Sequence, residues 1–310
     1  MDITRAYYEK CFEVSFLVKR GNEFQDFFSE IMEKRYPSDF VRVRPWGNVG
    51  DRKNDGYLKS ARTLFQVYAP NEMKAREAIS KIREDFDGAI PYWEKHFDIW
   101  VFVHNSRAGL GPDVTRTLLD IDRTNPQIKV DQWGFGELRR EVFELSEIDL
   151  ALLLGPAPNM NNILQLGFAS LQNVLSAIAR ESPSPDPDIR PIPPDKLSAN
   201  ALSHHTETLL NAGMIRADLV GEFFDRWHDP TLGNEIAEAF NREYERLRSQ
   251  NLLPDRIFYQ LWIFAGGVER GTPDHEAAVL AVLAYLFEKC EIFEESPVRD
   301  RDDLAHQAFE

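Results

Sequence analysis

The sequence predicts a two-domain protein with an N-terminal α/β domain and an all-helical C-terminal domain. Three observations support this division. Strand-like and helical patterns alternate from Asn22 to Leu145. Six prolines fall within Glu181 to Pro194, a composition typical of a stiff linker. The segments beyond it repeat with the 3.6-residue period of a helix. We therefore expect an α/β domain over residues 1–180, a linker over 181–194 and a helical domain over 195–310.

The elements of the first domain follow from local patterns. Asn22 to Tyr36 has apolar residues at helical spacing and opens on a residue that can cap a helix. Short alternating or apolar runs between turn residues then predict three strands, at Phe40–Arg44, Gly56–Leu58 and Thr63–Tyr68. Further helices are expected at Glu72–Phe86, Val114–Asp122 and Gly134–Leu145, and further strands at Phe97–His104 and Ile128–Asp131. This order indicates one α/β domain, with Asn71 as the expected cap of its second helix.

The second domain is expected to be helical throughout. The periodic segments are Ala199–Leu210, Asp218–Trp227, Gly233–Ser249, Asp255–Phe264 and Asp274–Cys290. Asp218, Gly233 and Asp274 stand where helix caps are expected. Aromatic residues recur through these segments, and their spacing is explained most simply by a packed core.

Charge is spread unevenly along the chain. The net charge is -15, and a protein this acidic does not wrap nucleic acid indiscriminately. Val41 to Arg83 nevertheless holds ten basic and four acidic residues, whereas residues 195–310 hold 11 basic and 22 acidic ones. We call Val41 to Arg83 the basic island. It is either a phosphate-binding surface or a solvated α/β surface, and the motif described below favours the first.

The sequence favours a cytoplasmic protein with no membrane contact. No apolar run approaches the roughly 20 residues that span a bilayer, and the charged first residues do not resemble a signal peptide. Cys11 and Cys290 lie far apart, as expected for a reducing compartment. The sequence contains no glycine-rich loop of the Walker type, so the chain is not expected to be an ATPase.

Three polar residues form a pattern that carries chemistry. Asp55 stands beside Gly56 at a strand edge, Gln66 lies in the apolar strand that follows, and Glu30 lies on the preceding helix. This layout resembles the PD-(D/E)XK, or restriction-endonuclease-like, core. The resemblance implies a mixed sheet flanked by helices, with Glu30, Asp55 and Gln66 around a Mg²⁺ or Mn²⁺ ion. Such an ion would neutralise the scissile phosphate and help to ionise the attacking water.

The match departs from the family pattern at one position. Two residues after Gln66, where the family has lysine, the chain has Tyr68, which supplies no cationic contact. Lys53, beside Asp55, and Lys74, in the first turn of the next helix, are the candidates to replace it. The resemblance thus implies the catalytic set Asp55, Gln66, Lys74 and Lys53.

Each of these residues also has a structural interpretation. An Asp-Gly pair such as Asp55-Gly56 is often a turn. Gln66 is either a ligand or a satisfied buried amide, since an unpaired buried amide costs roughly 1–3 kcal/mol. Glu30 is also typical of solvated helix surface. His104 and Asn105, at a strand end, either line a site or cap a loop.

The C-terminal domain carries a second resemblance. It extends over roughly Asn200 to Pro297, and its most specific part is FEKCEIF, Phe287 to Phe293. These segments resemble the C-terminal domains of ABC-three-component conflict systems of bacteria. The resemblance implies an effector component of an anti-phage system, docking through its helical domain on an ATPase and a small middle component.

Three functions remain open from the sequence. The first is a metal-dependent nuclease that acts on nucleic acid, with DNA the expected form. The second is a catalytically inactive nuclease fold that binds DNA or serves as a scaffold subunit in an ATPase-containing complex. The third is a purely structural subunit, which the acidic C-terminal half would suit. The sequence leaves open whether the protein forms a homo-oligomer.

Overall fold

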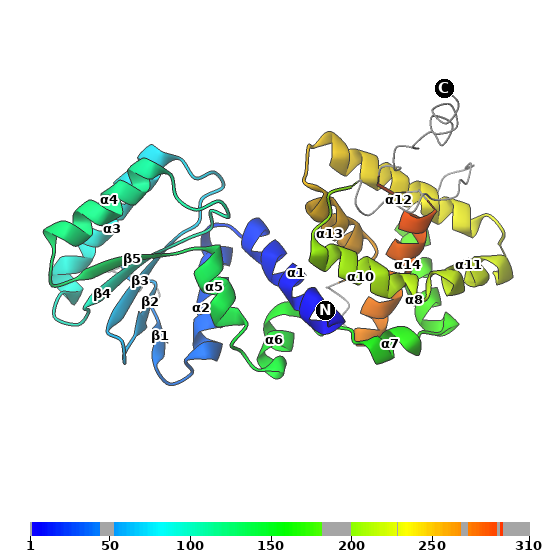
Figure 1. The fold of residues 1–310 in the computed structure, drawn as a ribbon, viewed down its shortest axis with the longest axis horizontal. Coiled ribbons are helices and arrows are strands. Elements are labelled where there is room, and N and C mark those ends of the chain that lie inside the picture. The colour runs from blue at the N-terminus through cyan, green and yellow to red at the C-terminus, as the bar shows by residue number, and fades with distance from the viewer. Residues whose placement is uncertain are drawn as a thin grey trace, which may run out of the picture. The chain divides into compact units, whose positions relative to one another are not determined.

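The computed structural model describes residues 2–43, 53–181, 200–227, 229–267, 272–289 and 292–293. The chain divides into two compact units. Phe12–Leu154 form one, here called the α/β unit, while Met1–Cys11 and Gly155–Glu310 form the other, here called the helical unit. The α/β and all-helical classes expected from the sequence are confirmed at this level (Figure 1). The end of the expected strand at Arg44 and the linker from residue 182 onward lie outside the described residues.

A mixed five-stranded sheet organises the α/β unit. Its strands lie in chain order, β1-β2-β3-β4-β5. Strand β2 is antiparallel to both of its neighbours, β1 and β3, whereas β3, β4 and β5 run parallel to one another (Figure 1). Their bounds are β1 Phe40–Arg42, β2 Gly56–Leu58, β3 Thr63–Tyr68, β4 Ile99–His104 and β5 Lys129–Trp133. All five expected strands are therefore present, each within about two residues of its expected ends.

Helices cover both faces of this sheet (Figure 1). On one face, α3 (Ala75–Trp93) and α4 (Pro112–Thr124) pack over a buried apolar cluster that includes Leu64, Trp100 and Phe102. On the other face, α2 (Gly21–Arg35) and α5 (Phe135–Val142) pack against the sheet, followed in the chain by α6 (Glu147–Leu154). Each large apolar side chain that is fully buried contributes about 1.5–3 kcal/mol to the free energy of folding. The two helical layers therefore stabilise the sheet by burying its apolar side chains.

Gly56 is required by close packing at the start of β2. A Cβ at this position would lie 2.3 Å from Cζ of the Phe40 ring on the neighbouring strand. Phe40 in turn packs on Phe28 and Phe65, with ring centroids 6.0 and 6.2 Å away. The Asp55-Gly56 pair is therefore not an isolated turn, because Gly56 is the first residue of a strand that an aromatic ring covers.

The helical unit is built around α14 (Pro273–Glu288). Between Glu276 and Glu288 this helix carries no charged residue, and the side chains from Ala277 to Ala284 are buried. A helix that is apolar on all sides must be surrounded by others. The helices that pack on it are α7 Met160–Leu164, α8 Phe168–Glu181, α10 His204–Met214, α11 Ala217–Arg226 and α13 Pro254–Phe264, while α12 Leu232–Ser249 packs on α8 and α13. In α10, a Cβ on Gly213 would lie 2.2 Å from the Leu280 carbonyl oxygen, so glycine permits the closest approach to α14.

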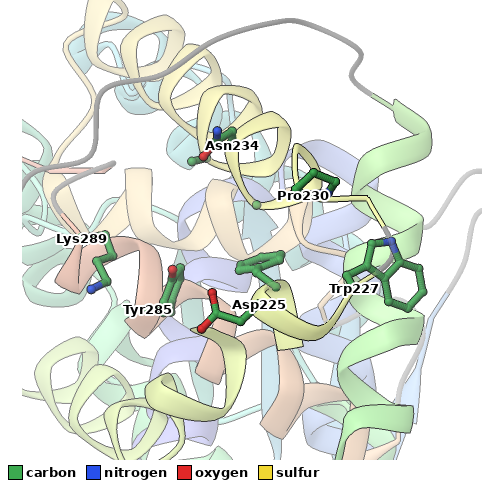
Figure 2. A pocket seen from close by; sticks show the side chains of 9 residues that line it. Asp225, Trp227, Pro230, Asn234, Tyr285 and Lys289 are labelled. Carbon is green, nitrogen blue, oxygen red and sulfur yellow. The ribbon is translucent and has the colours of Figure 1, made fainter. Parts of the chain in front are cut away.

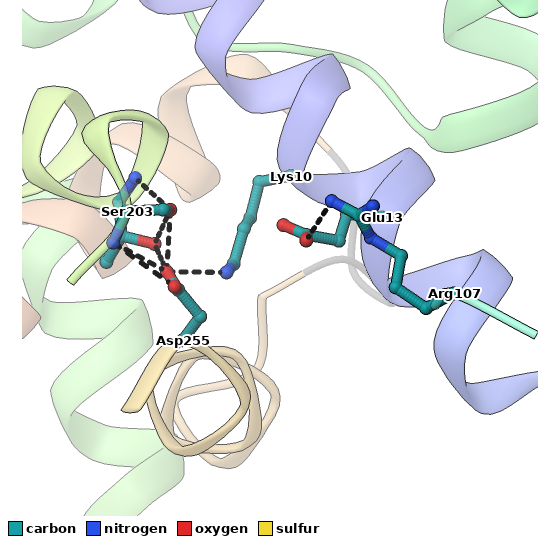
Figure 3. A network of polar contacts seen from close by, with 6 residues as sticks. Lys10, Glu13, Arg107, Ser203 and Asp255 are labelled. Carbon is teal, nitrogen blue, oxygen red and sulfur yellow. Dashed lines mark hydrogen bonds and ion pairs between the residues drawn. The ribbon is translucent and has the colours of Figure 1, made fainter. Parts of the chain in front are cut away.

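A polar network in the helical unit ties the first turns of α1 (Ile3–Val18) to α10 and α13 (Figure 3). Lys10 is 1% exposed, and its Nζ lies 2.9 Å from Oδ1 of Asp255. The Asp255 carboxylate also accepts hydrogen bonds from the backbone N–H and hydroxyl of Ser203, at 3.1 and 2.7 Å, and from the Thr206 hydroxyl. Burial alone would raise the pKa of Asp255, but the Lys10 charge and the hydroxyl hydrogen bonds hold this pKa below its usual value.

Several helix starts differ from the sequence expectation. Arg20 and Lys74, rather than Asn22 and Asn71, occupy the N-cap positions of α2 and α3, and neither makes a side-chain cap hydrogen bond. Asp218, Gly233 and Asp274 lie just inside their helices. At α14 the capping oxygen belongs to Thr272, which accepts from the His275 N–H. Tertiary packing shifts these ends by a few residues without changing the type of element.

The boundary between the units also differs from the expected one. The sequence pattern predicts residues 1–180 as the first domain, but Met1–Cys11 and the helices from Gly155 onward belong to the helical unit. The reason is that α8 packs on α12 and α14, and that the first turns of α1 carry Tyr7 and Lys10 into the same core. Linker composition marks where the chain is proline-rich, but it does not show which core the preceding helix joins.

A cut between Glu181 and Pro194 should therefore nick the chain without separating it. We expect an engineered protease site there to give two fragments that run apart in denaturing electrophoresis but elute together from a native sizing column. The packing of α8 on α12 and α14 is the physical reason. Two separate native peaks would contradict the boundary at Gly155 and restore the division at the linker.

Replacing Asp255 by asparagine should destabilise the helical unit by about 3 kcal/mol at neutral pH, because the buried Lys10 ammonium then loses its counter-ion. Because the folded pKa of Asp255 is lowered, its contribution is present above its unfolded pKa of about 4 and is lost as the pH falls through the folded pKa. Urea unfolding of both proteins at neutral and acid pH measures this.

Asp274→Asn is the matched control, since Asp274 accepts a hydrogen bond from Asn162 at the surface. We expect it to change stability by no more than about 0.5 kcal/mol. Equal stability of the Asp255→Asn protein and the wild type at neutral pH would show that the buried pair does not stabilise the unit.

Candidate functional site

The candidate site residues gather at one end of the five-stranded sheet. Because β3, β4 and β5 are parallel, their carboxyl ends at Tyr68, His104 and Trp133 share one edge. Strand β2 is antiparallel to β3 and therefore begins at this edge, just after Asp55. Open α/β sheets bind ligands beyond the carboxyl ends of their parallel strands. We call this edge the carboxyl edge.

Asp55 joins three elements at the carboxyl edge. The residue is 3% exposed, and its backbone N–H donates to the Phe65 carbonyl at 2.9 Å. Its Oδ2 accepts from the Val67 N–H at 2.7 Å, and its Oδ1 accepts from the Gln25 side-chain amide of α2 at 2.5 Å. The carboxylate is thereby oriented by β3 on one side and by α2 on the other.

Gln66 presents a buried acceptor that lacks a partner. The residue is 4% exposed, and its Oε1 accepts no hydrogen bond from any described residue. Strand alternation places its side chain on the same face of β3 as Leu64, the face that α3 covers. Leaving a buried acceptor unsatisfied costs about 1–3 kcal/mol, so a water or a ligand is expected there. The alternative, that Gln66 is a structural amide whose hydrogen bonds are all satisfied, therefore does not hold for Oε1 within the described chain.

Tyr68 does not replace the lysine of the nuclease pattern. Its ring is half-buried and packs on Phe102, with centroids 6.0 Å apart. Burial raises the pKa of Tyr68, and the charges of Glu77 and Asp85 raise it further. The phenol therefore stays neutral at physiological pH and offers a hydroxyl, not a cation, to the carboxyl edge.

The structure places the Lys53 amine against α3. Its Nζ lies 2.5 Å from Glu84 Oε1 and 3.1 Å from Asp85 Oδ1, and Asp85 also pairs with Lys81 at 2.9 Å. Burial would lower the pKa of Lys53, but the hydrogen bonds to Glu84 and Asp85 raise it above its usual value. Asp85 is fully buried, and its Oδ2 finds no partner in the described chain. Glu84 and Asp85 were not among the site residues predicted from the sequence.

Glu30 and Lys74 are placed at the surface. Glu30 lies on the exposed side of α2, and the residue of this helix that reaches Asp55 is Gln25. Five helical residues correspond to a rotation of about 140° and a rise of about 7.5 Å, so the two side chains point in different directions. The exposed Lys74 amine lies 3.5 Å from Glu72 and 3.9 Å from Glu77. Gln25 was not among the residues predicted from the sequence, and only its position in the first turns of the helix before the strands is consistent with this contact.

The described residues hold no group of three or more His, Cys, Asp or Glu side chains that could bind a metal ion. Asp55 and Gln66 do supply oxygen atoms, the ligand type that Mg²⁺ and Mn²⁺ prefer. The magnesium or manganese site over Glu30, Asp55 and Gln66 thus stays a prediction, with Glu30 facing solvent, Asp55 bonded to α2 and Gln66 on the face that α3 covers.

Many positive charges of the basic island are paired within the chain. Arg42 binds Asp26 and Glu33, and Arg62 binds Asp98 at 2.8 Å. Lys59 donates to the Ser38 carbonyl oxygen, and Lys53 and Lys81 both bind Asp85. These pairs lower the positive field that the sequence count suggests, so a phosphate would have to compete with carboxylates for them.

A pocket of about 530 Å³ opens at the carboxyl ends of β4 and β5. Its walls come from residues 104, 106–109, 131, 132 and 134–137. His104 lines it and is 2% exposed, whereas the neighbouring Asn105 side chain donates to the Pro70 carbonyl at 3.1 Å. His104 thus lines a pocket, whereas Asn105 makes a loop contact.

The helical unit has a smaller pocket of about 300 Å³ (Figure 2). Its walls come from α11, α12, α14 and the segment between α11 and α12. Asp225, Trp227, Tyr285 and Lys289 give it a mixture of aromatic and charged groups. Trp227 stacks on Phe223 with centroids 4.9 Å apart.

The comparisons with known proteins concern the helical unit. Residues 169–294 match the family described as C-terminal domain 10 of the ABC-three component (ABC-3C) systems. No curated protein and no solved structure matches the chain. The match begins inside α8 and extends through α14, which agrees with the unit boundary at Gly155 better than with a domain start at residue 195. The resemblance of the C-terminal region to these systems is confirmed.

No helix in the described ranges is both long enough and apolar enough to cross a bilayer.

Proposed function

We propose that this protein is a component of an anti-phage ABC-three component system that docks through its helical unit and binds nucleic acid through its α/β unit. The match of residues 169–294 to a C-terminal domain of these systems carries the proposal. The partners are an ATPase and a small middle component of the same system. The ligand of the α/β unit is nucleic acid, with DNA the expected form.

The architecture of the α/β unit supports a nucleic-acid ligand. A helix, three antiparallel strands, a helix and a parallel strand follow one another, which is the order of elements on which the restriction-endonuclease-like resemblance rests. Asp55 and Gln66 lie on adjoining strands at the carboxyl edge. The unpartnered Oε1 of Gln66 supports a ligand at this point.

The placement of the cationic groups favours binding without hydrolysis. The Lys53 amine bonds to Glu84 and Asp85, the Lys74 amine lies at the surface, and the Tyr68 phenol is neutral. A nuclease of this pattern needs a cation beside the scissile phosphate. The inactive nuclease fold is therefore the function that the geometry supports best.

Metal-dependent phosphodiester hydrolysis is the second candidate, and the observation that favours it is the buried, fixed carboxylate of Asp55. Asp55 would hold Mg²⁺ or Mn²⁺, which would supply charge neutralisation and an activated water, whereas the Gln66 side chain lies on the face that α3 covers. Asp55 is held by Val67 and Gln25 in a fixed orientation, as a ligand would need to be.

The helical unit alone should bind the partner components. We expect a chain in which a short Gly/Ser linker joins Cys11 to Gly155 to be captured by the tagged ATPase and middle component as efficiently as the full chain. A linker of roughly ten residues can span the two ends, because the hydroxyl of Tyr7, one helical turn before Cys11, lies 3.5 Å from the Cβ position of Gly155. Capture of the α/β unit alone, but not of this chain, would contradict the docking proposal.

Purified protein with Mg²⁺ or Mn²⁺, with and without its partners, should bind plasmid DNA in a salt-sensitive way and leave it uncut. Asp55→Asn is the matched variant, because an asparagine oxygen still accepts from the Val67 N–H. Cleavage by the wild type that is lost in a well-folded Asp55→Asn protein would establish the hydrolytic candidate instead. Absence of any DNA binding would contradict both.

A further inference from the structure

The pocket at the carboxyl ends of β4 and β5 is built from two loops. The first, Ser106 to Gly109, follows β4, and the second, around Gly134, leads from β5 into α5. Gly109 has a φ of +87°, a conformation that favours glycine. A Cβ on Gly134 would lie 2.7 Å from Cε1 of His104, so the absence of a side chain there allows the loop to pass over the buried imidazole.

His104 places a hydrogen-bond donor in this pocket. Its Nδ1 accepts from the Ser106 N–H at 3.3 Å, which leaves the ring proton on Nε2. Burial lowers the pKa of His104 to about 4, although Glu137 opposes this shift, so the ring is neutral at physiological pH. No described residue accepts a hydrogen bond from Nε2, so this donor of a pocket-lining residue is available to a ligand.

Gln132 places a hydrogen-bond acceptor in the same pocket. Its Oε1 is buried and receives no hydrogen bond from the described residues. The β4–β5 register sets Gln132 opposite Phe102, two residues before His104. The pocket therefore offers one donor and one acceptor, each without a partner within the described chain. The hydrogen-bonding edges of nucleobases carry a complementary acceptor and donor side by side.

The charges around the pocket favour a neutral ligand over a phosphate. Asp131 and Glu137 contribute carboxylates, which pair with Lys129 at 3.0 Å and with Arg140 at 2.7 Å. Arg107 is the cation of the lining, and it lies 3.6 Å above the Phe135 ring and 3.5 Å from Glu13 (Figure 3). The carboxylates of Asp131 and Glu137 would repel an anion, whereas they could accept hydrogen bonds from an exocyclic amino group.

We propose that this pocket binds an unstacked nucleobase bearing an exocyclic amino group, which donates to Gln132 while a ring nitrogen or carbonyl accepts from His104. The proposal rests on the proposed nucleic-acid function of the α/β unit, whose carboxyl edge it shares. A base taken out of its stack is read in this way by hydrogen bonds to its edge within a shaped pocket. The base belongs either to a single strand or to a free nucleoside, and both sources have the same chemistry.

Gly136 allows a test that does not disturb the fold. It lines the pocket, and a Cβ placed on it meets no atom within 4 Å. Gly136→Leu should therefore fill the pocket without a clash, and leucine is a better helix former than glycine at this position of α5. Gly167→Leu is the matched control, since Gly167 also meets no atom within 4 Å and lies in the helical unit. Thermal melting of both variants verifies folding.

The experiment measures the fluorescence anisotropy of labelled ten-nucleotide strands of adenine, cytosine or thymine bases titrated with the full chain. We expect the wild type and Gly167→Leu to bind the adenine or cytosine strand at least about tenfold more tightly than the thymine strand. Gly136→Leu should lose this preference, and Gln132→Leu should reduce it, because the acceptor is then replaced by an apolar group of similar size. Titrations with adenosine, cytidine, guanosine and thymidine form the second arm.

The outcomes separate this inference from the proposed function. Equal binding of all three strands, or a preference that Gly136→Leu retains, would overturn the base pocket and leave nucleic-acid binding standing. Binding of an amino-bearing nucleoside that Gly136→Leu abolishes, with no strand bound, would support the pocket and overturn the nucleic-acid function. Failure of every strand and nucleoside to bind the wild type would overturn the pocket.

Discussion

The arrangement of the carboxyl edge depends on the hydrogen bonds of one buried carboxylate. Asp55 holds β3 through the Val67 N–H and α2 through the Gln25 amide, at 2.7 and 2.5 Å. These contacts fix where β2 begins and which end of α2 meets the sheet. The parallel register of β3, β4 and β5 then brings Gln66, Tyr68 and His104 to the same edge. The ligand-binding chemistry proposed for this unit follows from that alignment.

The same edge bears on whether the nucleic acid of the proposed function is bound or hydrolysed. Hydrolysis of this pattern needs a cation beside the metal-bound phosphate, and the flexible lysine side chains that could supply it bind carboxylates instead. Lys53 is held by Glu84 and the buried Asp85, so moving its amine would leave Asp85 with fewer partners at a desolvated site. The neutral Tyr68 and His104 give the edge hydrogen-bonding groups, which suit recognition better than charge neutralisation.

The helical unit is stabilised differently. Its centre is the apolar α14, and the first turns of α1 are held there by the ion pair of Lys10 with Asp255 and by the contact of Tyr7 with Trp262, at a centroid distance of 5.1 Å. Cys11 lies in this core, and burial raises the pKa of its thiol, so it is unreactive. The unit thus includes residues from both ends of the chain, and the family match from residue 169 covers only its contiguous part.

The sequence by itself determined the elements whose patterns are local. Alternation and apolar runs located all five strands, and the 3.6-residue period located α2 to α5 and α10 to α14, because both signals depend on neighbours within a few residues. The same local spacing placed Asp55 just before β2 and Gln66 within the adjoining β3. The early helix α1 was not identified, since its apolar residues are interspersed with charges that only the folded chain pairs, as with Lys10 and Asp255.

Only the tertiary structure decided which side chains meet across elements. Gln25 rather than Glu30 reaches Asp55, because the side of α2 that faces the sheet is set by packing and not by charge. Lys53 extends to α3, and α8 joins the helical unit, through contacts between residues distant in sequence. A long flexible side chain or a connecting helix has several local options of similar energy, and the surrounding core selects one of them. The spacing of residues along the sequence therefore does not predict which option is selected.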